Sequence, residues 1–154
     1  MKADPIIITQ LNKVLGNELI AINQYLLHAR MFKNWGFQQL NTKIFQQSLD
    51  EMKHMDSLVE RILFLEGLPN VQDLGRLTIG ENLIEMLTGD LALEIESVRD
   101  LRNAITVAEG ANDFVSRNLL TSILEGEEQH IDWLESQLEL IERIGEHHYQ
   151  QTMV

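Results

Sequence analysis

The sequence predicts an all-α protein: a four-helix bundle of two antiparallel hairpins joined by one long crossover, followed by a short C-terminal helix. Three observations predict this fold. Apolar residues recur at steps of three and four along four long segments, which is the helical period. Chain breakers lie between these segments, and no segment alternates with the period of two that marks a strand. With 154 residues, 44% of them hydrophobic, the chain fits one domain, residues 1–154, built on one core.

The first hairpin is bounded by capping and breaking residues. Asp4 followed by Pro5 is typical of a helix start, because the carboxylate accepts a free backbone N–H and proline suits the first helical position. The first helix is expected over about residues 5–35 and stops at a glycine. The second is expected over about residues 38–65 and stops at a turn that contains glycine and proline.

The second hairpin has the same form. Its helices are expected over about residues 80–109 and 113–144, with a glycine-containing turn between them. Gly145 stops the fourth helix, and a short fifth helix is expected over about residues 146–152.

The lengths of the connections indicate how the helices lie in space. The connections at residues 36–37 and 110–112 are short, so each joins two antiparallel neighbours. The connection at residues 66–78 is long enough to run the length of a bundle whose helices measure about 40 Å. Two hairpins joined by one long crossover is a recognised four-helix topology.

The composition excludes several kinds of site. The chain has no cysteine, which excludes a disulfide scaffold, a thiolate zinc site, a cysteine-ligated iron–sulfur cluster and a cysteine nucleophile. It has 24 Asp and Glu against 12 Lys and Arg, for a net charge of −12. Such a surface repels nucleic acid and anionic lipid, so we expect no nucleic-acid and no membrane partner. The same charge serves solubility and attracts cations.

The first residues carry only a short apolar run, Ile6–Ile8, which is too short for the core of a signal peptide. No apolar stretch reaches the length needed to span a membrane. We therefore expect a cytoplasmic protein.

Each long helix carries one glutamate on the stripe that should face the core. In the first helix, Glu18 lies at helical spacing within an apolar stripe that runs from Leu11 to Ala29. The equivalent glutamates of the other helices are Glu51, Glu94 and Glu127. The second and fourth helices add a histidine three residues after the glutamate, at His54 and His130.

The four glutamates are expected at one level of the bundle, because each lies close to the middle of its helix. The separation of Glu18 from Glu51 equals that of Glu94 from Glu127. The two halves of the chain therefore look like copies of one helical hairpin.

Four ionised carboxylates at one level of an apolar core are costly unless something compensates their charge. Protons could do so, but the two histidines favour metal ions. Two divalent cations balance four carboxylates, and carboxylate with imidazole suits iron or manganese. Glutamate and histidine three residues apart share a helix face, so one metal can bind both. The sequence thus predicts a dinuclear centre like that of ferritin-like di-iron bundles.

Four stretches of the sequence resemble bacterioferritin, and the resemblance covers essentially the whole chain. They are Leu15-Gly16-Asn17-Glu18-Leu19 through Asn23-Gln24-Tyr25, Asp50-Glu51-Met52-Lys53-His54, Arg61-Ile62-Leu63-Phe64-Leu65-Glu66-Gly67-Leu68-Pro69-Asn70, and His130-Ile131-Asp132-Trp133-Leu134-Glu135. The resemblance implies a ferritin-like fold and a hollow 24-mer cage built from two-fold dimers. It also implies iron storage and detoxification by a ferroxidase, which oxidises Fe(II) with oxygen or hydrogen peroxide and passes Fe(III) to a mineral core.

By motif match, the resemblance assigns the catalytic and metal-binding residues of a di-iron centre that holds two Fe ions per subunit. They are Glu18, Glu51, His54, Glu94, Glu127 and His130. Glu51 and Glu127 are the expected bridges between the two irons.

The resemblance further implies a haem b shared between two subunits, with one methionine of each as an axial ligand. The matching position is Met52. Met52 points about 100° away from its neighbour Glu51, towards an apolar flank with Phe45 and Val59 that a second copy of the helix could cover. An ordinary interface methionine would look the same. Met55 is the competing position, but it lacks the family match.

Further histidines and aromatic residues have weaker assignments. Tyr25 and Trp133 are expected near the level of the centre, where they could donate electrons or simply pack in the core. His28 and the pair His147-His148 lack a phased carboxylate, so they are expected at the surface or in subunit contacts.

One part of the chain departs from the family pattern. Gln46 and Gln47 stand beside Asp50 where many bacterioferritins have histidine and glutamate. The resemblance therefore does not extend to an auxiliary iron site on the cavity wall.

The resemblance implies partners for iron release. A bacterioferritin-associated ferredoxin would supply electrons, the haem would carry them inward, and a paralogue could co-assemble with this chain.

Three other functions remain open. A di-iron or di-manganese redox enzyme without a cage, such as a catalase or oxygenase, would be a monomer or dimer in light scattering. A haem-binding structural subunit is disfavoured by the complete set of six ligands. A DNA-protecting mini-ferritin is disfavoured by the metal centre inside the bundle and by the net charge of −12.

Overall fold

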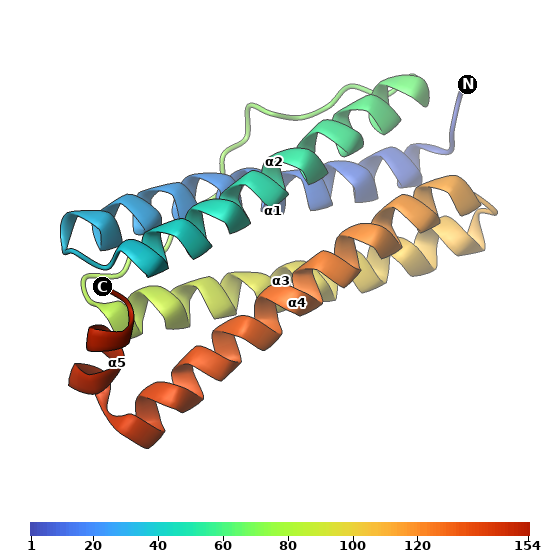
Figure 1. Cartoon of the computed structure of the whole chain (residues 1–154). Helices are drawn as coiled ribbons and strands as arrows, with labels where there is room; N and C mark the ends of the chain where they lie inside the picture. The colour runs from blue at the N-terminus through green and yellow to red at the C-terminus, as the bar shows by residue number, and fades with distance from the viewer.

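The computed structural model describes all residues, 1–154, and is all-helical with no strand (Figure 1). The five helices are α1 (Pro5–Asn34), α2 (Gln38–Phe64), α3 (Leu83–Gly110), α4 (Phe114–Ile144) and α5 (Glu146–Thr152). The predicted four-helix bundle with a short C-terminal helix is confirmed. None of the helices has an apolar stretch long enough to cross a membrane.

The helices pair as the connection lengths predict. α1 packs along α2 and α3 packs along α4, and the two hairpins meet chiefly through α1 and α3 (Figure 1). α2 and α4 share far fewer contacts. The crossover runs back along the α1–α2 hairpin, and α5 folds across one end of the bundle (Figure 1).

Side-chain caps define the helix starts. Asp4 caps α1 by accepting the backbone N–H of Ile6 at 3.0 Å. α3 starts at Leu83 and not near residue 80 as predicted, because the side chain of Asn82 accepts the backbone N–H of Glu85 at 3.0 Å and makes Asn82 the cap. At the other end of the bundle, Gly145 has φ +84°, a left-handed conformation that glycine adopts without strain, and it separates α4 from α5.

The apolar core consists of two clusters, one at each end of the bundle. The first cluster includes Leu11, Leu15, Leu58, Leu101 and Ile123. The second includes Tyr25, Ala29, Ile44, Leu87 and Leu134. In each long helix, the predicted core glutamate lies between its contributions to the two clusters. A polar layer therefore divides the core at mid-height.

His28 does not lie at the surface, so the prediction for this residue is wrong. It is fully buried, and its Nδ1 lies 2.9 Å from Oδ1 of Asp90 on α3. Its Nε2 accepts a hydrogen bond from the backbone N–H of Gly80 at 3.1 Å. Nδ1 therefore carries the ring proton and donates a hydrogen bond to Asp90. Gln24 also donates to Asp90, at 2.8 Å, and accepts the backbone N–H of Thr78.

This buried network fastens the end of the crossover to α1 and α3. Burial raises the pKa of Asp90, and the hydrogen bonds from His28 and Gln24 only partly oppose that rise. Sequence reasoning missed this network, although Asp90 lies four residues before Glu94 and therefore shares its face of α3.

We expect His28→Ala to lower the free energy of unfolding by about 3 kcal/mol, because it leaves the buried carboxylate of Asp90 without its main donor. Urea denaturation at neutral pH measures this change. The double variant His28→Ala with Asp90→Ala should lose less than the two single variants added together. His148→Ala, which alters an exposed histidine, should stay within about 0.5 kcal/mol of the wild type. Equal effects of His28→Ala and His148→Ala would contradict this account.

Candidate metal centre

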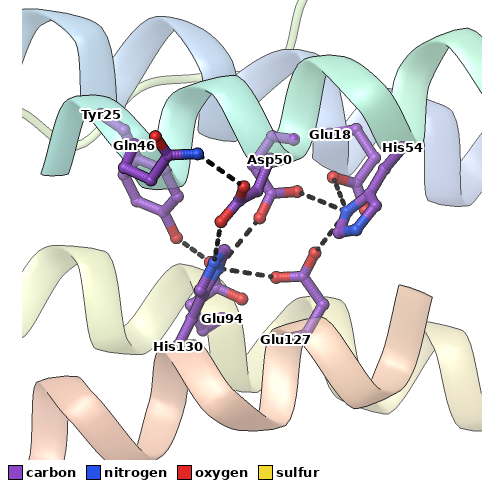
Figure 2. A network of polar contacts seen from close by, with 9 residues as sticks. Glu18, Tyr25, Gln46, Asp50, His54, Glu94, Glu127 and His130 are labelled. Carbon is purple, nitrogen blue, oxygen red and sulfur yellow. Dashed lines mark hydrogen bonds and ion pairs between the residues drawn. The ribbon is translucent and has the colours of Figure 1, made fainter. Parts of the chain in front are cut away.

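Six side chains from the four long helices converge in the polar layer (Figure 2). α1 supplies Glu18 and α3 supplies Glu94. α2 and α4 each supply a glutamate and the histidine one turn later, which are Glu51, His54, Glu127 and His130. Each of the four glutamates is only 1% exposed, so their carboxylates are shielded from bulk water.

The six residues form two overlapping clusters with metal-ligand spacing. One holds Glu18, Glu51, His54 and Glu127, and the other holds Glu51, Glu94, Glu127 and His130. Within each cluster the ligand atoms lie within 4.8 Å of one another. Glu51 and Glu127 belong to both clusters, which is the arrangement expected of bridging carboxylates.

The first cluster is arranged around Nδ1 of His54. This nitrogen lies 3.5 Å from Oε2 of Glu18, 3.3 Å from Oε2 of Glu51 and 3.2 Å from Oε1 of Glu127.

The second cluster is arranged around Nδ1 of His130. This nitrogen lies 3.1 Å from Oε1 of Glu51, 3.4 Å from Oε1 of Glu94 and 3.6 Å from Oε2 of Glu127. Each of the two shared glutamates therefore turns one oxygen towards His54 and the other towards His130.

The carboxylates outnumber the donors that could satisfy them. Five buried oxygens have no hydrogen-bond donor: Oε1 and Oε2 of Glu18, Oε1 of Glu51, Oε2 of Glu94 and Oε1 of Glu127. Buried acceptors without donors are destabilising unless a cation or a proton takes the place of the donor. Oxygen and imidazole ligands together suit iron or manganese, so the residues present fit a pair of such ions.

Without a metal ion, protons compensate part of the charge. Burial raises the pKa of Glu94, and the neighbouring Glu127 raises it further. Burial lowers the pKa of His54, but the contacts with Glu127 and Glu51 outweigh burial and raise it to about 9. Burial likewise opposes the charge of His130, yet Glu127, Glu51 and Glu94 raise its pKa even more strongly. The centre therefore holds protons that metal ions would displace.

Comparison with known proteins identifies the family. A family model for the ferritin-like domain matches residues 8–144. Bacterioferritin BfrA of Mycobacterium tuberculosis is 44% identical over 149 residues, covering 97% of this chain and 94% of that protein. The bacterioferritin of Streptomyces coelicolor is 43% identical over 154 residues, covering 100% of this chain and 92% of the relative. The chain belongs to the bacterioferritin family.

Tyr25 extends the centre of this bacterioferritin on one side. Its hydroxyl donates a hydrogen bond to Oε1 of Glu94, and its ring stands edge-on to that of His130 with ring centroids 6.5 Å apart (Figure 2). Burial raises the pKa of Tyr25, and the nearby charge of Glu94 raises it further, so the phenol keeps its proton. Trp133 is more peripheral, with Nζ of Lys43 5.4 Å from its ring centroid.

A polar pocket of about 360 Å³ lies over the centre between α2 and α4, where these helices share few contacts. No hydrophobic residue lines it, and both His54 and His130 lie in its wall. Gln46, Gln47 and Asp50 line it as well. Sequence reasoning considered these three residues only for a cavity-wall site and missed that Oδ2 of Asp50 lies 3.3 Å from Nε2 of His130. The sequence signal that could have indicated this contact is the position of Asp50 directly before the ligand Glu51.

The methionines differ in exposure. Met52 follows Glu51 on α2 and is 45% exposed, so it points out of the bundle as its helical position predicts. Met55, the competing position, packs against the first core cluster. Of these two methionines, Met52 is therefore the one whose side chain lies at the surface. His147 and His148 are exposed on α5.

We expect Glu18→Gln to stabilise the metal-free protein by about 1 kcal/mol, because it replaces a buried carboxylate that has no hydrogen-bond donor by a neutral amide. The same change should reduce the rise in melting temperature that Co(II) gives the wild type. Thermal unfolding with EDTA and with Co(II) measures both effects.

Asp100→Asn is the matched control for this prediction. Asp100 is a buried carboxylate that accepts from Asn17 at 2.9 Å and lies 3.6 Å from Nζ of Lys13. Its replacement should destabilise the metal-free protein and preserve the rise with Co(II). If Glu18→Gln instead destabilised the metal-free protein and kept the rise with Co(II), Glu18 would have a structural role alone.

Proposed function

We propose that this bacterioferritin stores and detoxifies iron by oxidising Fe(II) at the centre within each bundle and depositing Fe(III) as mineral inside a hollow cage. The observation that carries this proposal is the pair of clusters sharing Glu51 and Glu127, with buried oxygens that lack donors. A purely structural polar layer would be expected to satisfy those oxygens with protein donors.

Each metal position has its own ligands in this proposal. Glu18 and His54 would hold one iron, Glu94 and His130 would hold the other, and Glu51 and Glu127 would serve both positions. Together the four carboxylates balance the charge of two Fe(II) ions, so the loaded layer is electrically neutral. A pair of Fe(II) ions held in this way would supply the two electrons that reduce oxygen or hydrogen peroxide, without one-electron products.

The surrounding residues keep the reaction within the bundle. The apolar clusters on either side of the layer exclude bulk water. Tyr25 keeps its proton and donates a hydrogen bond to Glu94, which holds that carboxylate beside His130. The polar pocket between α2 and α4 provides the approach for ions and oxidant, because it is the cavity that reaches both histidines.

The proposal includes an assembly of two dozen chains, built from two-fold dimers in the cytoplasm, with a haem b between paired copies. Met52 is exposed beside the partly buried Phe45 and Val59, and a thioether is a suitable axial ligand for haem iron. A haem there would carry electrons inward from a bacterioferritin-associated ferredoxin, so that mineral iron leaves as Fe(II). Co-assembly with a paralogue is compatible with the same surfaces.

Loss of both histidines is expected to lower the initial rate of Fe(II) oxidation by about 100-fold or more. The variant is His54→Ala with His130→Ala, measured by stopped-flow absorbance after adding Fe(II) in air or with hydrogen peroxide. His147→Ala removes an exposed histidine outside the centre and should keep the wild-type rate.

Light scattering of each protein shows whether assembly is retained. A double variant that assembles and still oxidises iron at the wild-type rate would rule out the proposed centre. A wild-type monomer or dimer would instead favour a redox enzyme without a cage.

Met52→Leu should abolish the visible spectrum of a haem held by two methionines, because leucine keeps the apolar volume and removes the sulfur ligand. Met55→Leu is the matched control and should retain that spectrum. Absorption spectra after reconstitution with haem test this expectation. Haem retained in Met52→Leu but lost in Met55→Leu would move the ligand to the competing position.

A further inference from the structure

The two histidines of the centre differ in what their outer ring nitrogen meets. Nε2 of His130 lies 3.3 Å from Oδ2 of Asp50, and Nε2 of Gln46 donates to the other oxygen of that carboxylate at 3.1 Å (Figure 2). His54 has no such partner: no protein group accepts a hydrogen bond from its Nε2. Its ring lies against Gly126, where a β-carbon would sit 3.3 Å from Cε1 and 3.4 Å from Nε2.

Asp50 and Gly126 occupy equivalent places in the two halves of the chain. Each residue directly precedes a shared glutamate, Asp50 before Glu51 and Gly126 before Glu127. Each also faces the histidine carried by the other helix of the α2–α4 pair. The six metal ligands are matched between the halves. The residue before the shared glutamate is therefore the position at which the two halves of the centre differ.

A carboxylate that accepts the outer N–H of a metal-binding histidine has two effects. It fixes the proton on Nε2, which leaves the lone pair of Nδ1 free for the metal, and it makes the ring a stronger electron donor. Partners of this kind are worth about 10-fold to 100-fold in metal affinity. The side chain of His54 is instead 18% exposed, so its outer nitrogen can donate only to water.

We infer that Asp50 is a positioning residue for His130 and makes the metal position of His130 and Glu94 the tighter of the two, so that it fills before the position of His54 and Glu18. This inference rests on the proposed function, because it requires both metal positions. Gln46 supports the arrangement by holding Asp50 through its amide. Asp50 thus lies in the wall of the pocket and positions a ligand of the buried centre.

Stepwise metal binding alone does not test this inference, because the first cation repels the second even at two identical positions. The test must show which step depends on Asp50. Co(II) is a suitable probe, since its visible absorption reports coordination without turnover. The assembled protein is stripped of iron and titrated with Co(II) by calorimetry and absorbance.

Asp50→Asn is expected to weaken the tighter Co(II) step by about 10-fold and to leave the weaker step unchanged. Asp56→Asn removes the same charge from an exposed position on the same helix, and both steps should keep their wild-type affinities. Thermal melting of the metal-free variants checks that both remain folded. Equal weakening of both steps by Asp50→Asn, or no weakening of either, would overturn the inference.

The reciprocal variant places a carboxylate beside His54. Gly126→Asp is expected to strengthen the weaker Co(II) step by about 10-fold relative to Gly126→Ala, which adds the β-carbon without the charge. No gain over Gly126→Ala would overturn the assignment of the asymmetry to this position. Failure of the wild type to bind two Co(II) per chain would overturn the metal centre itself, an outcome distinct from two steps that ignore Asp50.

Discussion

Four glutamates buried at one height of an apolar bundle are the constraint on which the rest of the structure depends. Their charges repel one another, and protein donors satisfy only part of their oxygens. Two histidines reduce the repulsion, and because Glu51 and Glu127 belong to both clusters, two cations would be able to share the four carboxylates. The residues depend on one another, because removing a histidine leaves more buried charge to be compensated by protons or cations.

The bundle is built around this layer. Apolar clusters above and below it provide the hydrophobic burial that a charged layer cannot, and they keep the ligands away from bulk water. Close packing within each hairpin fixes the height of each glutamate, whereas the sparse contact between α2 and α4 leaves a polar pocket at the histidines. The His28–Asp90 pair performs a separate task one turn away, since it fastens the crossover that connects the two hairpins.

The features that follow from helical periodicity could be predicted from the sequence, including the five helices and the common level of the glutamates. The choice of Glu51 and Glu127 as the shared pair came from the resemblance to bacterioferritin. Steps of three and four residues determine which side chains share a face, so Glu18 and His54 could be assigned to the core face of their helices from the sequence. Contacts that depend on the rotation of one helix against another could not be placed in this way. Asp50 reaches His130 across the α2–α4 gap, and His28 finds its carboxylate on α3. Both contacts need the packing of the whole bundle.

The polar layer also connects iron supply to the lifetime of the protein. A ligand that binds only the folded state stabilises that state by an amount that grows with the logarithm of its concentration, and iron bound at the buried carboxylates would stabilise the bundle in this way. A chain without iron would then open more often at mid-height, where its core is interrupted, and would expose its backbone to proteases more often. The empty store would therefore be degraded faster than the filled one.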